Sequence, residues 1–209
     1  AIFACKEAVR TNLRALSVIF NDEKMAEKNG LEAKHRREII KGLFLLTPVV
    51  SSTFASFNNT FKDLLNGDIG MLLIDEAGQA NLTNALGALL RSKMAVVVGD
   101  PLQLEPVVTL PVSLNNAILS YCDAKEEFNL LKSSVQLRAD KAQNIGTYIK
   151  GSGESIWVGS PLIVHRRCAN PMFEISNETT YDDMMILGRN EASKFANTNV
   201  QTKWIDVRS

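Results

Sequence analysis

The stretch Leu72-Leu-Ile-Asp-Glu-Ala-Gly-Gln-Ala80 decides the fold that this sequence predicts. It begins as a short apolar run and ends on two acids, Asp75 and Glu76. A run this short and apolar at successive positions is typical of a strand buried on both faces of a parallel sheet. Ligands of open α/β sheets bind at the carboxyl ends of the strands, so the two acids stand where a ligand site is expected.

Two further apolar runs predict neighbouring strands. Leu43-Phe-Leu-Leu-Thr-Pro-Val-Val50 comes before the deciding stretch, and Met94-Ala-Val-Val-Val-Gly99 follows it. The segments between them, 51–66 and 79–92, have the length of helical crossovers. Strands that alternate with helices in this way predict an α/β fold with a parallel sheet.

The N-terminal part predicts a helical hairpin. Apolar residues there recur at helical spacing, at Ile2, Val9, Leu13, Leu16 and Phe20. Asn29-Gly30 interrupts the pattern, and a second helix is expected over 31–40. The hairpin is rich in both signs of charge, which favours a solvated surface. The alternative is a nucleic-acid contact through Lys34, Arg36 and Arg37.

The C-terminal part is looser. Prolines at 101, 106 and 111 predict a surface path, followed by a helix over 117–131. Glycines at 146, 151, 153 and 159 predict a linker-like stretch, with a domain boundary near 150–160. Beyond it we expect a strand over 161–164, a helix over 170–180 and a last strand over 202–207.

Composition limits the class of protein. The 23 basic and 23 acidic side chains leave no net charge, so any nucleic-acid contact must come from a local patch. The three cysteines, Cys5, Cys122 and Cys168, lie far apart, which argues against disulfides and zinc and fits a reducing cytoplasm. No apolar run reaches the roughly 18 residues of a membrane helix, so no membrane partner is expected.

A second polar group follows the third strand, in Val96-Val-Val-Gly-Asp-Pro-Leu-Gln-Leu-Glu-Pro106. Parallel neighbouring strands would bring Asp100 and Gln103 close to Asp75 and Glu76. Adjacent carboxylates with Mg²⁺ and phosphate oxygens between them would make a hydrolytic site. The structural alternatives are acids that begin a helix and a simple Gly-Asp-Pro turn.

These residues resemble two motifs of superfamily 1 helicases. Asp75-Glu-Ala-Gly-Gln79 is similar to motif II, the Walker B form, and Gly99-Asp-Pro-Leu-Gln-Leu-Glu-Pro106 to motif III. The glutamine form resembles the nonsense-mediated-decay-type branch with its bacterial AAA-domain helicases. Thr47-Pro-Val-Val-Ser-Ser-Thr-Phe54 resembles motif Ib, and His165-Arg-Arg-Cys-Ala-Asn-Pro171, followed by Asn177 and Tyr181, resembles motif IV.

The resemblance implies a role for each matched residue. Asp75 would coordinate Mg²⁺, Glu76 would be the catalytic base, Gln103 would sense the γ-phosphate of ATP, and Arg167 would reach that phosphate. Nucleotide contacts are implied for Gln79, Asp100 and Arg166, and contacts to the DNA or RNA backbone for Thr47, Pro48, Ser51 and Ser52. Helix capping by the hydroxyls is the alternative for the last group. His165 is expected to be a hydrogen-bonded structural residue.

The resemblance also implies an architecture. It has a helical hairpin insertion over 1–41, a partial RecA-like P-loop NTPase domain over 42–150 and the start of a second RecA-like domain over 151–209. The phosphate cradle G-x-x-x-x-G-K-[ST] is absent from the printed sequence. We therefore expect a piece of a larger helicase whose other domains are its partners, with the chain alone inactive.

Two alternatives remain open. One is a degenerate, non-catalytic interaction module on the same fold. The other is a small metal-dependent hydrolase built on Asp75, Glu76 and Asp100, which would need no cradle.

Overall fold

The computed structural model describes residues 6–21, 32–150 and 155–188. The chain divides into two compact units, 1–138 and 139–209, and each is described by itself. This division lies ahead of the boundary near 150–160 that the glycines suggested. None of the helices in the described ranges is long and apolar enough to cross a membrane.

The first unit contains the parallel strand pair that the sequence predicts. Strand β1 (Leu72–Ile74) pairs with β2 (Ala95–Val97) in parallel, with Leu72 opposite Ala95 and Ile74 opposite Val97. The short 3-10 helix η2 (Ala77–Gln79) and helix α5 (Leu82–Arg91) connect the two strands. The chain is thus a mixed α/β fold, and the crossover expected over 79–92 is confirmed.

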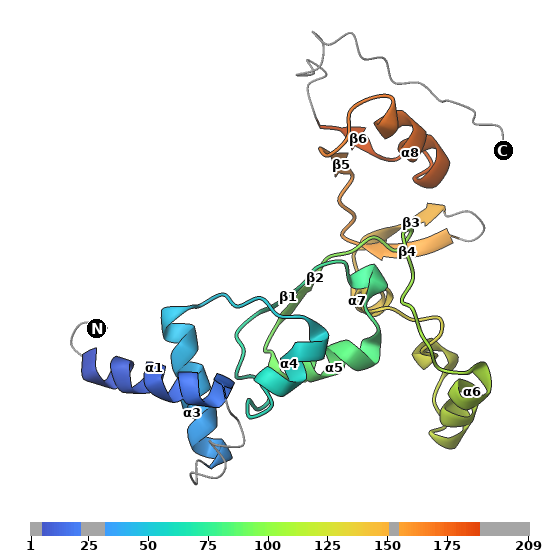
Figure 1. The fold of residues 1–209 in the computed structure, drawn as a ribbon. Coiled ribbons are helices and arrows are strands. Elements are labelled where there is room, and N and C mark those ends of the chain that lie inside the picture. The colour runs from blue at the N-terminus through green and yellow to red at the C-terminus, as the bar shows by residue number, and fades with distance from the viewer. Residues whose placement is uncertain (1–5, 22–31, 151–154, 189–209) are drawn as a thin grey trace, which may run out of the picture. The chain divides into compact units, whose positions relative to one another are not determined.

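One face of this strand pair is covered by helices (Figure 1). Ile74 of β1 and Val97 of β2 pack in one cluster with Ala85 of α5 and with Phe54, the first residue of helix α4 (Phe54–Thr60). The side chains that alternate with them are exposed, with Leu73 at 66% and Val96 at 42%. Burial on one face only is typical of a sheet that is covered by helices on a single side.

Helices α1 (Lys6–Asn21) and α3 (Ala33–Leu46) pack against each other, as expected of a hairpin. Their core cluster contains Leu16 and Ile40 together with Phe57, Phe61 and Leu64 from α4 and the loop after it. The predicted stripe on α1 was partly wrong, because Leu13 and Phe20 are nearly half exposed while Ile19 is buried. The residue Ile2 lies outside the described ranges.

The strand predicted over Leu43–Val50 was wrong. Helix α3 continues to Leu46, and the chain from there to Thr53 forms neither helix nor strand. The apolar run continues the helix because Ile39, Leu43 and Phe44 face the same core cluster. The helix ends just before Pro48, whose ring disfavours the helical conformation at the preceding residue.

The rest of the first unit runs through irregular chain between Gln103 and Pro111, as the prolines suggested. Helix α6 (Val112–Tyr121), the 3-10 helix η3 (Glu126–Phe128) and helix α7 (Val135–Ala142) follow. The helix expected over 117–131 therefore begins earlier and ends at Tyr121. Buried Asn115 on α6 holds the segment after η3 against this helix, since its Nδ2 donates to Asn129 Oδ1 at 3.0 Å.

The second unit begins with a hairpin where a linker-like stretch was expected. Strands β3 (Gly146–Lys150) and β4 (Ser155–Gly159) pair in antiparallel fashion, so that prediction was wrong. The glycines predicted a linker, but the side chains of the two strands alternate between the two faces of the hairpin, and Ile149 and Val158 are buried. Trp157 anchors the hairpin, because its Nε1 donates to the carbonyl oxygen of Asp140 at 3.0 Å.

Helix α8 (Met172–Thr180) confirms the helix expected over 170–180. It lies between two short parallel strands, β5 (Val164–His165) and β6 (Ile186–Leu187). The expected strand over 161–164 is β5, shifted toward the C-terminus. The last strand predicted over 202–207 lies outside the described residues.

Candidate functional site

The ends of β1 and β2 lie side by side at one edge of the sheet. Beyond Ile74 the pairing continues, since Val98 N donates to Ile74 O at 2.8 Å and Ala77 N donates to Val98 O at 3.0 Å. The acids Asp75 and Glu76 follow one strand, and Asp100 follows the other. The structure thus brings the two polar groups to the same strand edge.

The two strand ends pack backbone against backbone, through glycine. A Cβ atom on Gly78 would lie 2.7 Å from the carbonyl oxygen of Asp100. A Cβ atom on Gly99 would lie 2.7 Å from the nitrogen of Gly78 and 2.8 Å from that of Ala77. Both separations are too short for a side chain, so this close approach requires glycine at both positions. We call this contact the glycine junction.

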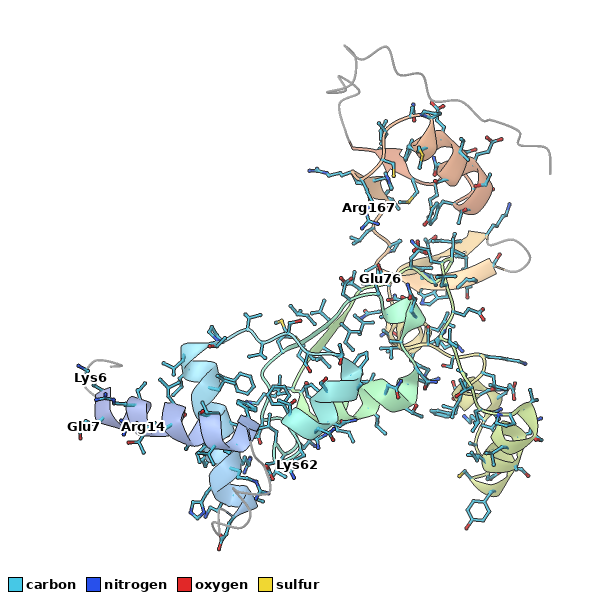
Figure 2. The ribbon with its side chains drawn as sticks, in the orientation of Figure 1. Lys6, Glu7, Arg14, Lys62, Glu76 and Arg167 are labelled. Carbon is cyan, nitrogen blue, oxygen red and sulfur yellow. The ribbon has the colours of Figure 1, made fainter. Side chains whose placement is uncertain are left out.

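Glu76 adopts a left-handed backbone conformation, with φ of 53° and ψ of 40°. For a residue with a Cβ this costs about 1 kcal/mol. The bend turns the chain from β1 into η2 and leaves the side chains of Asp75 and Glu76 exposed. Figure 2 labels Glu76 at this bend. Strain of this kind gathers at functional sites, where surrounding packing holds it in place.

Asp75 and Glu76 lack a cationic partner among the described residues. The one contact recorded for either side chain is local, from Glu76 N to Asp75 Oδ1 at 3.0 Å. An exposed carboxylate with one oxygen held by its own backbone suits Mg²⁺, which takes one or two carboxylates and keeps several waters. Within the described ranges, no three His, Cys, Asp or Glu side chains are grouped to hold a metal together.

Asp100 organises the second strand end. Its Oδ1 accepts from Leu102 N at 2.9 Å, which closes the Gly-Asp-Pro turn weighed as the structural alternative. Its Oδ2 accepts from Gln103 Nε2 at 2.8 Å. Gln103 is therefore oriented by Asp100 rather than by the acids of β1, and its side chain is exposed, as is that of Gln79 on η2.

A buried polar segment supports the glycine junction, and the sequence reasoning missed it. Residues 133–136, Ser-Ser-Val-Gln, are all buried although three of them are polar. Val135 N donates to Ala80 O at 3.0 Å, and Gln136 Oε1 would lie 3.0 Å from a Cβ on Gly99. Polar residues rarely fill a buried stretch without a structural role, but no period or motif in the sequence signals it.

The segment from Thr47 to Thr53, expected to contact nucleic acid, is exposed. It includes all four candidates, Thr47, Pro48, Ser51 and Ser52. Ser52 Oγ donates to the carbonyl oxygen of Thr53 at 3.1 Å, and Thr53 Oγ1 caps α4 by accepting from Ser56 N at 3.3 Å. The helix cap considered for the hydroxyls is thus made by Thr53, which the sequence reasoning did not single out.

The motif IV region lies in the second unit. His165 Nε2 accepts from Cys168 N at 2.9 Å, and its ring packs on Phe173, so the expected structural role of His165 is confirmed. Asn177 is also structural, because its side chain holds both the N–H and the carbonyl oxygen of Met185. Arg166 and Arg167 follow β5 and are exposed. Their reach to a nucleotide stays a prediction.

Two basic residues of α3 serve the fold. Arg36 forms a two-pronged ion pair with Asp63, with both contacts at 2.9 Å, and Arg37 forms one with Asp68. The Arg37 hydrogen bonds hold the pKa of the Asp68 carboxyl at about 2, below its ordinary value of 3.8. The pKa of Arg37 is raised in turn. These pairs favour the helical-hairpin interpretation over a nucleic-acid contact by Arg36 and Arg37.

Comparison with known proteins identifies part of the chain. Residues 10–110 match the family model described as an AAA domain. The matched range includes both strands, the glycine junction and the segment from Thr47 to Thr53. No curated protein and no solved structure matches the chain. Residues 10–110 are therefore similar to an AAA domain of the superfamily 1 helicase type, a lineage of P-loop nucleotide hydrolases.

Proposed function

We propose that this chain supplies the magnesium-binding and phosphate-sensing part of an ATP-driven DNA or RNA helicase. One observation carries the proposal. The strands β1 and β2 end at one edge, and there two exposed carboxylates, Asp75 and Glu76, have no cationic partner among the described residues. Uncompensated adjacent acids at a strand edge are suited to a ligand that brings positive charge with it.

The roles follow from the positions of the side chains. Asp75 would hold Mg²⁺ through its outer oxygen, and the bound ion would offset phosphate charge. Glu76 stands next to it, exposed, and would take the proton of the attacking water. Gln103, oriented by Asp100, presents its amide oxygen at the second strand end and would sense the γ-phosphate. Gln79 and Asp100 would line the same edge.

The exposed segment from Thr47 to Thr53 supports the nucleic-acid part of the proposal. Its exposed, irregular backbone and the hydroxyls of Thr47 and Ser51 offer donors of the kind that contact phosphates without reading sequence, and Ser52 lies beside them. In the second unit, Arg166 and Arg167 offer exposed guanidinium groups, which suit phosphate oxygens. Coupling between the units is proposed by resemblance to the family.

The test is nucleic-acid-stimulated ATP hydrolysis by the full-length product of the gene that encodes this sequence. Glu76→Gln keeps the shape and removes the base, so turnover should fall at least about 100-fold while ATP is still bound. Glu178→Gln on α8 makes the same chemical change at an exposed position in the second unit and should leave turnover unchanged. Equal turnover in all three proteins would contradict the proposal.

The absence of stimulated hydrolysis would instead favour the non-catalytic interaction module. The small metal-dependent hydrolase receives no support from the described residues, because Asp75, Glu76 and Asp100 are not grouped as a three-acid site there. For the 209-residue chain alone we expect no measurable ATP turnover, since its sequence lacks the G-x-x-x-x-G-K-[ST] cradle. Turnover in that chain that Glu76→Gln abolishes would refute this expectation.

A further inference from the structure

We infer that helix α1 is a second nucleic-acid contact, which holds the phosphate backbone of a single strand through a row of three cations. The row consists of Lys6, Arg10 and Arg14. The inference rests on the proposed function, because it assumes that the protein acts on nucleic acid. It concerns different residues from the segment Thr47–Thr53 and from the basic residues of α3.

The spacing of the three cations puts them in a row. They are four residues apart, so successive members lie about one helical turn, or about 6 Å, apart along the axis. All three are exposed, and Lys6 and Arg14 extend from the surface of α1 (Figure 2). Regularly spaced cations match a polymer whose negative charges also repeat at regular intervals.

The row is not needed for packing. The buried face of α1 is formed by Leu16 and Ile19. Leu16 belongs to the core cluster of the hairpin, and Ile19 is buried as well. At about 100° per residue, Arg10 and Arg14 point to the side of the helix away from these two residues. The cations are therefore free to meet a partner without any loss of contacts in the core.

The other basic residues of the hairpin differ in their pairing. On α3, Arg36 pairs with Asp63, Arg37 with Asp68 and Lys41 with Glu38. For Lys6, Arg10 and Arg14, no ion pair occurs among the described residues, and Glu7 is the one acid within α1. Among the described residues of the helix pair, Lys34 on α3 is one further exposed cation with no ion pair, so three of these four cations lie on α1, even though the whole chain carries no net charge.

The flank of the row favours a single strand as the occupant. Leu13 is 48% exposed and lies three residues after Arg10, so the helical spacing places it next to the row, whereas Phe20 lines a hollow with Arg36 and Asp63. An exposed apolar side chain beside a row of cations can contact the face of an unstacked base next to its phosphates. A membrane surface fits less well, because the apolar face of α1 is packed against α3 instead of being available for lipid.

The test is binding of the 209-residue chain to fluorescent oligo-dT and oligo-U, measured by anisotropy over a range of salt concentrations. The variant Lys6→Gln/Arg10→Gln/Arg14→Gln removes the row and keeps good helix formers. Its affinity at low salt should fall about tenfold or more, and the slope of log K against log salt should decrease by about 2. Both oligonucleotides should respond alike, because phosphates are the shared target.

A matched control removes three charges elsewhere. Lys93→Gln/Lys125→Gln/Lys141→Gln changes three exposed lysines outside α1 and should leave the affinity within about twofold. Circular dichroism and thermal melting of both variants should match the unaltered chain. If poly-glutamate displaced the oligonucleotides as well as unlabelled oligo-dT does, the row would be a general anion surface and the inference would be overturned.

Two outcomes separate this inference from the proposed function. If the α1 variant binds like the unaltered chain while Thr47→Ala/Ser51→Ala weakens binding, the α1 contact is refuted and the proposed function stands. If the α1 variant loses binding while Glu76→Gln leaves ATP turnover intact in the full-length protein, the α1 contact stands and the proposed function fails. Absence of any binding by the unaltered chain at low salt would also overturn the α1 contact.

Discussion

Helix α3 and the end of β1 both carry adjacent charged residues, Arg36 and Arg37 on α3 and Asp75 and Glu76 after β1. The charges on α3 are neutralised by acids of the same chain, whereas, among the described residues, those after β1 are not. Arg36 and its partner Asp63 are both less than a tenth exposed and are joined by two hydrogen bonds. Asp75 and Glu76 are exposed and have only a neighbouring main-chain N–H as a recorded contact. Charge that is neutralised within the chain stabilises the fold, whereas uncompensated charge at a strand end is available to a ligand.

The largest effect on stability is expected at Arg36. Arg36→Gln leaves the buried Asp63 carboxylate without its partner, so the free energy of unfolding should fall by about 3 kcal/mol. Urea denaturation measures the change. Arg10→Gln, on the exposed side of α1, should change it by no more than about 0.5 kcal/mol. Equal losses in the two variants would break the distinction between paired and solvent-facing charges.

The next effect concerns the strand ends. They are held together by the close packing of main chain at the glycine junction, and not by ion pairs such as those of α3. Gly99→Ala places a methyl group 2.7 Å from Gly78 N, so we expect a loss of about 1–3 kcal/mol. Gly70→Ala is the control, because a Cβ there meets nothing within 4 Å, and it should be neutral or slightly stabilising. A tolerated alanine at position 99 would show that the junction opens readily.

A smaller effect of opposite sign is expected at Glu76. Asparagine accepts the left-handed conformation better than glutamate, so Glu76→Asn should stabilise the fold by up to about 1 kcal/mol while it removes the proposed base. Glu76→Ala has no short polar side chain to hydrogen-bond locally in this conformation, so it should bring no such gain. Thermal melting of the two variants decides the matter, and identical melting temperatures would argue that the bend carries no strain.

The last effect concerns Asp68 and acid. Its native pKa of about 2 lies below the ordinary value of 3.8, so its contribution is present above about pH 4 and is lost as the pH falls toward 2. Asp68→Asn should therefore lower the melting temperature at pH 7, and the difference from the unaltered chain should shrink between pH 4 and pH 2. A difference that stays constant over that range would exclude the Arg37 pair as its source.

The sequence predicted the strand ends well because the evidence there is local. Short β-branched runs with acids directly behind them define β1, β2 and the positions of Asp75 and Asp100. It failed for Leu43–Val50, where an apolar run was the end of α3, because runs of this length look alike in a helix and in a buried strand. It also missed the β3–β4 hairpin. The glycines there predicted a linker, and the alternation of buried and exposed residues along the two strands was too weak to indicate a hairpin.

Contacts between distant residues could not be predicted. Nothing in the order of residues says that Arg36 meets Asp63 or that Arg37 meets Asp68, because each pair is separated by about 30 positions. The left-handed conformation of Glu76 was equally hidden, since glutamate rarely adopts it. The roles of Gln103 and Arg167 were assigned by resemblance, and the structure adds only the bond from Gln103 to Asp100.

The glycine junction has a consequence for how such a protein can evolve. At Gly78 and Gly99 the main chain of each strand end packs directly against the main chain of the other. Glycine has no side chain, so neither position can adjust its packing when the opposite segment changes. A recombination point between residues 79 and 98 would join strand ends that were not shaped for each other. We therefore expect chimeras of related domains to survive crossovers before Ile69 or after Pro106 far more often than crossovers within α5.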